Sequence, residues 1–304
     1  MSDATVGTVG TVVVPLDGGP VAERALEVAH VLAPAFGASI ELVAATDHLT
    51  LEEQGVRSGR VYFDAVQASS DGVEIVTVLE PGDAAAVILG RVRGRPNALI
   101  CMTTRGHTGI GALLLGSVAE RVIDGATGPI LLIGPHCEPS TIQAPRTDRD
   151  PPDGTDAAAN GHLIFTYDGS DVSESALPLA VEWARRLDLD LRVVMVLHRD
   201  NTFLGDHDST AARKRARAMI DRLRSDGVPA RLELVNGIEP ARAISHFASA
   251  LPAALVVTAS HGSGGATRTA LGRVATRLAH HCPCPVLVRR VGEPDSVSPT
   301  AGGS

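Results

Sequence analysis

Lysine is nearly absent from this chain. Lys214 is the only lysine among its 27 basic residues, and no glycine lies near it in the run 211–215. A P-loop requires a lysine directly after its glycines, because that side chain reaches the terminal phosphates of the nucleotide. The sequence therefore excludes the Walker-type nucleotidases. It also contains neither the G-x-S-x-G turn of α/β-hydrolases nor the G-x-G-x-x-G turn of dinucleotide-binding domains.

Aromatic residues, cysteines and long apolar runs are also scarce. Aromatics make up 3% of the residues, and the formal net charge of −8 disfavours binding to a nucleic-acid backbone. No apolar run approaches the roughly 18 residues of a transmembrane helix. The first basic residue is Arg24, so the positive start of a secretory signal is missing. We therefore expect a cytoplasmic protein with four reduced cysteines and no nucleic-acid or membrane partner.

The chain contains an internal repeat. Residues 12–19 return as 163–170, 99–106 as 255–262, Gly116 as Gly272, and 129–132 as 285–288. The offset is 151 residues at the first landmark and 156 at the later three, so the copies differ by a few loop residues.

The repeat and the composition predict the domain boundaries. One domain is expected over 1–137 and a second over 162–291. The proline-rich, acidic segment 138–161 is expected to be an extended linker, and the Gly/Ser/Pro-rich tail 292–304 to be disordered.

Each half alternates short apolar runs with helical patterns. In the first half the expected strands are 11–16, 39–45, 73–79, 98–103 and 129–133, and the expected helices are 21–36, 83–92 and 117–124. In the second half Ala216, Met219, Ile220 and Leu223 mark the helix before the third strand. This alternation predicts an α/β fold of two tandem doubly wound domains, each a five-stranded parallel sheet with helices on both faces.

Two segments of each half are candidates for a ligand site, because doubly wound sheets bind ligands beyond the carboxyl ends of their strands. In the first half these are the Asp17-Gly18 turn and the glycine-bearing loop from Arg105 to Gly116. Ser117 would stand at a helix start, where free amides and the helix dipole favour phosphate. The alternative is that the glycines only form a tight loop and Asp17 only caps a helix.

These residues also carry a family resemblance. The Asp17-Gly18 turn, the run 102–106 and, nine residues later, Gly116-Ser117-Val118 together resemble a universal stress protein domain. The second half closes with 279–288, which is similar to the last helix and strand of that family. The resemblance covers both halves and implies a tandem universal stress protein, with a fold like that of the adenine nucleotide alpha hydrolases.

The resemblance implies a nucleotide site in each half, since the ATP-binding members carry G-x-x-G, nine residues, then G-[ST]. Asp17 would meet the ribose or adenine, Ala45 the adenine edge, and the loop glycines with Ser117 the phosphates. The implied first site consists of Pro15, Asp17, Ala45, Thr103, Gly106, Gly116, Ser117 and Val118. The implied weaker second site consists of Asp168, Val196, Gly262, Gly272 and Arg273.

Both implied sites depart from the family motif. Thr103 stands where the first glycine of the motif is expected, and Ala259 stands there in the second half. Arg273 replaces the serine or threonine of the motif, and Thr166 occupies the place of Pro15. We therefore expect nucleotide to favour the first half.

Three functions remain open at this stage. The leading one is a stress-response protein that binds or senses ATP, ADP or AMP, with or without magnesium, and lacks efficient turnover. The alternatives are an interaction module with degenerate pockets and a slow ATP hydrolase. The resemblance also implies that the two domains form an internal pseudo-dimer through the strands 129–133 and 285–289, with further homo-oligomers open.

Other signals are discounted. The run 280–284, His-His-Cys-Pro-Cys, contains soft metal ligands, but no second ligand pair lies near it in the sequence, so no metal site is expected. The basic run 213–224 is interpreted as the solvated face of a helix. His107 and His261, which lie in the candidate loops, are interpreted as incidental.

Overall fold

The computed structural model describes residues 7–46, 62–64, 66, 72–105, 115–143, 161–197, 207–260 and 271–290. The loop residues Gly106, His107, His261 and Gly262, most of the expected linker, and the tail 292–304 lie outside the described residues. Among the described helices, none combines the length and apolar character that a membrane crossing requires.

The first half contains the expected strands and helices. Its strands are β1 (Thr11–Pro15), β2 (Ser39–Thr46), β3 (Ile75–Pro81), β4 (Ala98–Thr103) and β5 (Ile130–Ile133). Its helices are α1 (Pro20–Phe36), α3 (Ala84–Val92) and α4 (Ser117–Gly125). Every residue of β4 and β5 is buried, which explains why both strands are continuous apolar runs.

The second half repeats this order with two changes. Its strands are β6 (His162–Thr166), β7 (Asp190–Leu197), β8 (Ala230–Asn236), β9 (Ala253–Ala259) and β10 (Val286–Arg289). Its helices are α5 (Asp171–Glu174), α6 (Leu177–Arg186), α7 (His207–Ser225), α8 (Pro240–Ser249) and α9 (Arg273–His281). Two helices, α5 and α6, take the place of α1. Helix α7 lies between β7 and β8, whereas only residues 62–64 and 66 are described as helical between β2 and β3. All four apolar residues that predicted α7 are buried.

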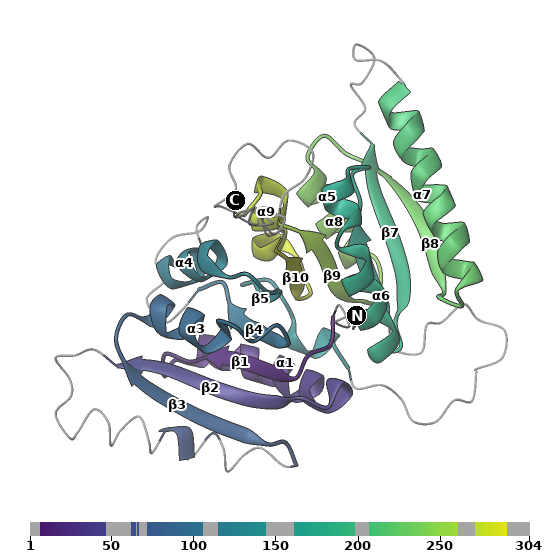
Figure 1. Cartoon of the computed structure of the whole chain (residues 1–304). Helices are drawn as coiled ribbons and strands as arrows, with labels where there is room; N and C mark the ends of the chain where they lie inside the picture. The colour runs from purple at the N-terminus through teal and green to yellow at the C-terminus, as the bar shows by residue number, and fades with distance from the viewer. Residues whose placement is uncertain are drawn as a thin grey trace, which may run out of the picture.

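The ten strands form one continuous sheet in the order β3-β2-β1-β4-β5-β10-β9-β6-β7-β8 (Figure 1). Strands pair in parallel within each half. The halves meet where β5 pairs antiparallel with β10, with Leu131 opposite Leu287. The predicted contact between the last strands of the two domains is confirmed. The pairing removes two exposed strand edges, each of which would otherwise be open to another chain.

Polar contacts reinforce this junction. The Arg290 side chain donates to the carbonyls of Asp124 (3.2 Å) and Ala126 (3.1 Å), at the carboxyl end of α4 in the other half. An arginine is favourable there, because the last carbonyls of a helix carry a partial negative charge.

The first residues of the expected linker are structured rather than extended. Pro139–Thr141 form a short 3-10 helix, and the amide of Glu138 donates to the carbonyl of Pro283 at 2.8 Å. The Thr141 hydroxyl donates to the carbonyl of Ala254 at 3.2 Å, and Ile142 is buried in the core. The apolar side chain of Ile142 and its burial explain why this stretch packs onto the domains.

Candidate functional site

The strand order creates one switch point in each half. In the first half the chain leaves β1 for β2 on one side, and returns to place β4 on the other side of β1. The carboxyl ends of β1 and β4 therefore border one crevice, where doubly wound sheets bind their ligands. Asp17 follows β1 and Thr104 follows β4. The two candidate segments of the first half, the Asp17-Gly18 turn and the loop after β4, therefore both begin at this crevice.

The Asp17 turn is held by its own carboxylate. Oδ1 of Asp17 accepts a hydrogen bond from the amide of Gly19 at 2.9 Å, and Gly18 has a positive φ of 78°. This contact is the structural role that the sequence left open, because it shapes the turn before α1. The Asp17 side chain and Gly18 are both exposed, so a ligand in the crevice can approach them.

The amino terminus of α4 lies against the end of β4. The amide of Gly116 donates to the carbonyl of Thr104 at 2.8 Å, which closes the loop between them. The amide of Glu120 bonds to the carbonyl of Gly116 at 2.9 Å, so the amides of Ser117, Val118 and Ala119 precede the hydrogen bonds of the helix. Together with the exposed Ser117 hydroxyl, they suit an anion.

Thr103, which replaces a glycine of the family motif, is used to hold the loop. Its hydroxyl donates to the carbonyl of Arg105 at 2.7 Å, and only 7% of the residue is exposed. The side chain is therefore turned onto its own loop. Pro15 ends β1, Val118 is the second residue of α4, and the half-buried Ala45 lies near the end of β2.

Tyr62 is a neighbour of this site that sequence reasoning missed. Its hydroxyl donates to Oε1 of Glu23 at 2.8 Å. Burial, the hydrogen bond to Glu23, and the negative charges of Glu23 and Asp17 all raise the pKa of Tyr62. Tyr62 therefore stays protonated as a donor near the Asp17 turn. No periodic pattern marks this position, so the sequence offers no signal for it.

The second half has the same two features, an aspartate turn and a loop closed by a backbone hydrogen bond. Oδ1 of Asp168 accepts from the amide of Ser170 at 3.0 Å, and Gly169 has a φ of 89°. The amide of Gly272 donates to the carbonyl of Ser260 at 2.6 Å, which closes the corresponding loop before α9. Val196 lies in β7, the counterpart of β2.

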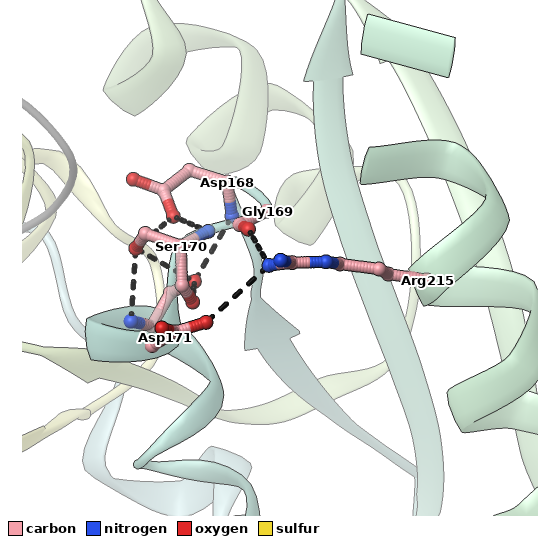
Figure 2. A network of polar contacts seen from close by, with 6 residues as sticks. Asp168, Gly169, Ser170, Asp171 and Arg215 are labelled. Atoms are coloured by element: carbon pink, nitrogen blue, oxygen red, sulfur yellow. Dashed lines mark hydrogen bonds and ion pairs between the residues drawn. The ribbon is translucent and has the colours of Figure 1, made fainter. Parts of the chain in front are cut away.

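The two aspartate turns differ in what covers them. Helix α7 packs against the second turn, where a Cβ placed on Gly169 would lie 2.6 Å from Cβ of Ala212. Arg215 of α7 reaches the same turn and donates to the carbonyl of Gly169 (3.1 Å) and to Asp171 (3.3 Å), as Figure 2 shows. By contrast, no described atom lies within 4 Å of a Cβ placed on Gly18.

This finding adds a contact to the basic run 213–224, which the sequence pattern predicts to be a solvated helix face. Most of its basic side chains are exposed, as expected of a solvated face. Arg215 is also exposed, but it contacts the turn that would border the second nucleotide site. Arg273, at the start of α9, is exposed as well. Two arginines therefore stand where the resemblance implies the second site, whereas the corresponding positions of the first half have Ser117 and a turn that no described side chain contacts at Gly18.

An ion pair fixes the helix that supplies the anion donors. Arg121 of α4 makes two hydrogen bonds to the carboxylate of Asp83, at 2.6 and 2.7 Å, and Asp83 also caps α3. Arg277 of α9 contacts the carboxylate of Glu239, just before α8, through one nitrogen. These pairs lie on exposed side chains, so we assign them a positioning role rather than a large contribution to stability.

Comparisons with known proteins agree with this repeated architecture. The model of the universal stress protein family matches residues 8–134 and 160–290. The chain is 30% identical over 199 residues to universal stress protein Rv2005c of Mycobacterium tuberculosis, covering 62% of this chain and 61% of that protein. It is 29% identical over 140 residues to universal stress protein MJ0531 of Methanocaldococcus jannaschii, covering 41% of this chain and 79% of that protein.

The solved structures agree at the level of the fold. A universal stress protein from Archaeoglobus fulgidus superposes with a TM-score of 0.67 at 18% identity, covering 93% of this chain and 98% of that one. A putative universal stress protein from Pseudomonas aeruginosa superposes with a TM-score of 0.63 at 15% identity. The superposition covers 92% of this chain and 93% of that one. The chain belongs to the universal stress protein family and carries two of its domains in tandem.

Proposed function

We propose that this universal stress protein binds an adenine nucleotide in its first domain and acts as a sensor, without efficient turnover, in the cytoplasm. The observation that carries the proposal is the meeting of two segments at the β1/β4 switch point. One segment presents the Asp17 carboxylate, and the other presents the amide end of α4 with the Ser117 hydroxyl. A nucleotide has ribose hydroxyls for the first and phosphates for the second.

The helix terminus suits phosphate for two reasons. Its first amides have no partner within the helix, and the helix dipole adds a partial positive charge at this end. The closing bond from Gly116 to Thr104 holds these amides beside the β4 end, so a phosphate would meet preformed donors. Thr103 supports the loop through Arg105 rather than opposing the ligand.

The first domain is favoured because, among the described residues, no atom lies within 4 Å of a Cβ placed on Gly18 of its aspartate turn. In the second domain α7 packs on the Gly169 turn, and Arg215 bridges Gly169 and Asp171. A ligand there would have to displace these contacts, and it would meet Arg273 in place of the Ser117 hydroxyl. Losing one neutral hydrogen bond costs about 1 kcal/mol, which is about fivefold in affinity, before any steric effect.

Calorimetric titration with ATP, ADP and AMP, with and without magnesium, tests this proposal. We expect Asp17→Ala to weaken binding at least about tenfold, because it removes a charged acceptor of a ligand hydroxyl. The matched variant Asp168→Ala makes the same change in the covered turn and should leave the affinity within about twofold. No binding of any of the three nucleotides, or a larger loss in Asp168→Ala, would overturn the proposal.

A turnover assay separates the sensor from a slow hydrolase. The proposal predicts that bound ATP is recovered intact after prolonged incubation. Release of phosphate that disappears in Gly116→Val, a change at the start of α4, would instead favour the hydrolase.

A further inference from the structure

Three histidines from both halves of the chain converge beside the junction of the domains. They are His136, which follows β5, and His280 and His281 at the end of α9. Each ring offers one nitrogen as a ligand atom, and these three nitrogens all lie within 4.8 Å of one another. We propose that these three histidines bind a divalent transition-metal ion that joins the two domains.

The spacing suits a single ion. Three atoms no more than 4.8 Å apart have a common point within about 2.8 Å of all of them, and Zn–N bonds are about 2.0–2.1 Å. The remaining adjustment is below 1 Å per ring, and His136 and His281 are exposed and can rotate. The rings of His136 and His281 are nearly parallel, with centroids 6.2 Å apart.

The backbone holds the two segments together on both sides of His136. At Gly134 the chain passes so close to α9 that a Cβ placed there would lie 2.1 Å from the carbonyl oxygen of Ala279. At Glu138 the amide donates to the carbonyl of Pro283 at 2.8 Å. Arg24 donates to the carbonyls of Gly134 and Cys137 as well. The histidines are therefore brought together by contacts that do not depend on a metal.

The ligand chemistry selects the class of metal. Three imidazoles without a carboxylate favour zinc, copper or nickel over magnesium or calcium, which prefer oxygen ligands. The last turn of α9 adds the partial negative charge of a helix carboxyl end.

Arg105 contacts one of the three histidines, and this contact provides a further test of the site. Its Nη2 lies 2.9 Å from Nε2 of His280, and because a guanidinium can only donate, Nε2 must be unprotonated. This nitrogen can therefore accept a metal without releasing a proton, provided that Arg105 moves aside. Arg105 is then a competitor of the metal at His280, and its removal should tighten binding.

The experiment titrates the purified full chain with Zn²⁺ in competition with a chromophoric chelator, in the absence of nucleotide. We expect one tight Zn²⁺ per chain, and a loss of at least about tenfold in affinity for His136→Ala and for His281→Ala. The control His246→Ala removes an exposed histidine outside the cluster and should bind as the parent does. Arg105→Ala should bind several-fold more tightly, an effect that a purely structural role of the histidines does not predict.

The Tm measured with and without Zn²⁺ gives a second test, which remains informative if a histidine variant is less stable than the parent. Saturating Zn²⁺ should raise the Tm of the parent protein, because binding that needs both domains stabilises the folded chain, and should leave the Tm of His136→Ala unchanged. The inference is overturned if the parent binds no Zn²⁺, or if the two histidine variants bind it as tightly as the parent. Neither result bears on the nucleotide site, whose proposed residues do not include these histidines.

Discussion

At Gly134 the backbone of the first domain passes close to Ala279 of the second, and replacing this glycine by alanine should destabilise the protein. The added Cβ would lie 2.1 Å from the carbonyl oxygen of Ala279, whereas an ordinary contact between carbon and oxygen is about 3.3 Å. Either the end of β5 or the end of α9 must therefore move by about 1 Å. Both are backbone segments in a buried junction, so neither can yield as a flexible side chain would.

The expected loss in the free energy of unfolding of Gly134→Ala follows from overpacking. Forcing extra atoms into a packed core costs about 1–3 kcal/mol, and the short distance at Gly134 places this variant at the upper end. For a protein of this size the loss corresponds to a fall in Tm of about 4–5 °C. Thermal unfolding followed by circular dichroism measures it, and the fluorescence of Trp183, which is fully buried in the second domain, gives a second probe.

Gly90→Ala is the matched control. Gly90 is an exposed glycine within α3, and no described atom lies within 4 Å of a Cβ placed there. The same substitution should therefore stabilise the protein by about 0.5–1 kcal/mol through the higher helix propensity of alanine. If Gly134→Ala proved as stable as the parent, or Gly90→Ala lost as much as Gly134→Ala, the packing argument at the junction would be wrong.

Two further predictions concern the covered turn and a buried ion pair. Gly169→Ala should cost more stability than Gly18→Ala in urea unfolding, because both glycines have positive φ but only Gly169 faces Ala212; equal losses would contradict the covering role of α7. Burial alone would raise the pKa of Glu41, but hydrogen bonds and positive charge from Arg91 and Arg95 lower it. The folded-state pKa is thus below the unfolded one, so the contribution of Glu41 is complete above about pH 4.3 and is lost as the pH falls through the folded-state pKa. Glu41→Gln should therefore cost about 1–3 kcal/mol at pH 7, and its Tm should converge with that of the parent in acid; a constant difference down to pH 3 would refute this.

The sequence predicts the sheet well because its central strands are buried on both faces. Runs such as those of β4 and β5 are apolar without interruption, and they recur at a nearly constant offset in the second half. The pairing of β5 with β10 could be predicted from the resemblance, since both are the last strands of their domains and would otherwise be exposed edges.

The features that escaped prediction depend on contacts between distant segments. Nothing local to His136 indicates that it lies beside His280 and His281, because the pairing of two domains brings them together. The role of Arg215 is equally hidden, since an arginine on a basic helix face has the same local pattern whether it meets solvent or a turn. The division of the first helix of the second half into α5 and α6 also went unpredicted.

The number of nucleotides bound per chain tests the central claim most directly. Native mass spectrometry of the intact protein, first as purified and then titrated with ATP, reports each bound nucleotide as a discrete mass increment. The account predicts a single high-affinity increment that is lost in Asp17→Ala and retained in Asp168→Ala. Two increments of equal affinity, or none with any adenine nucleotide, would contradict it.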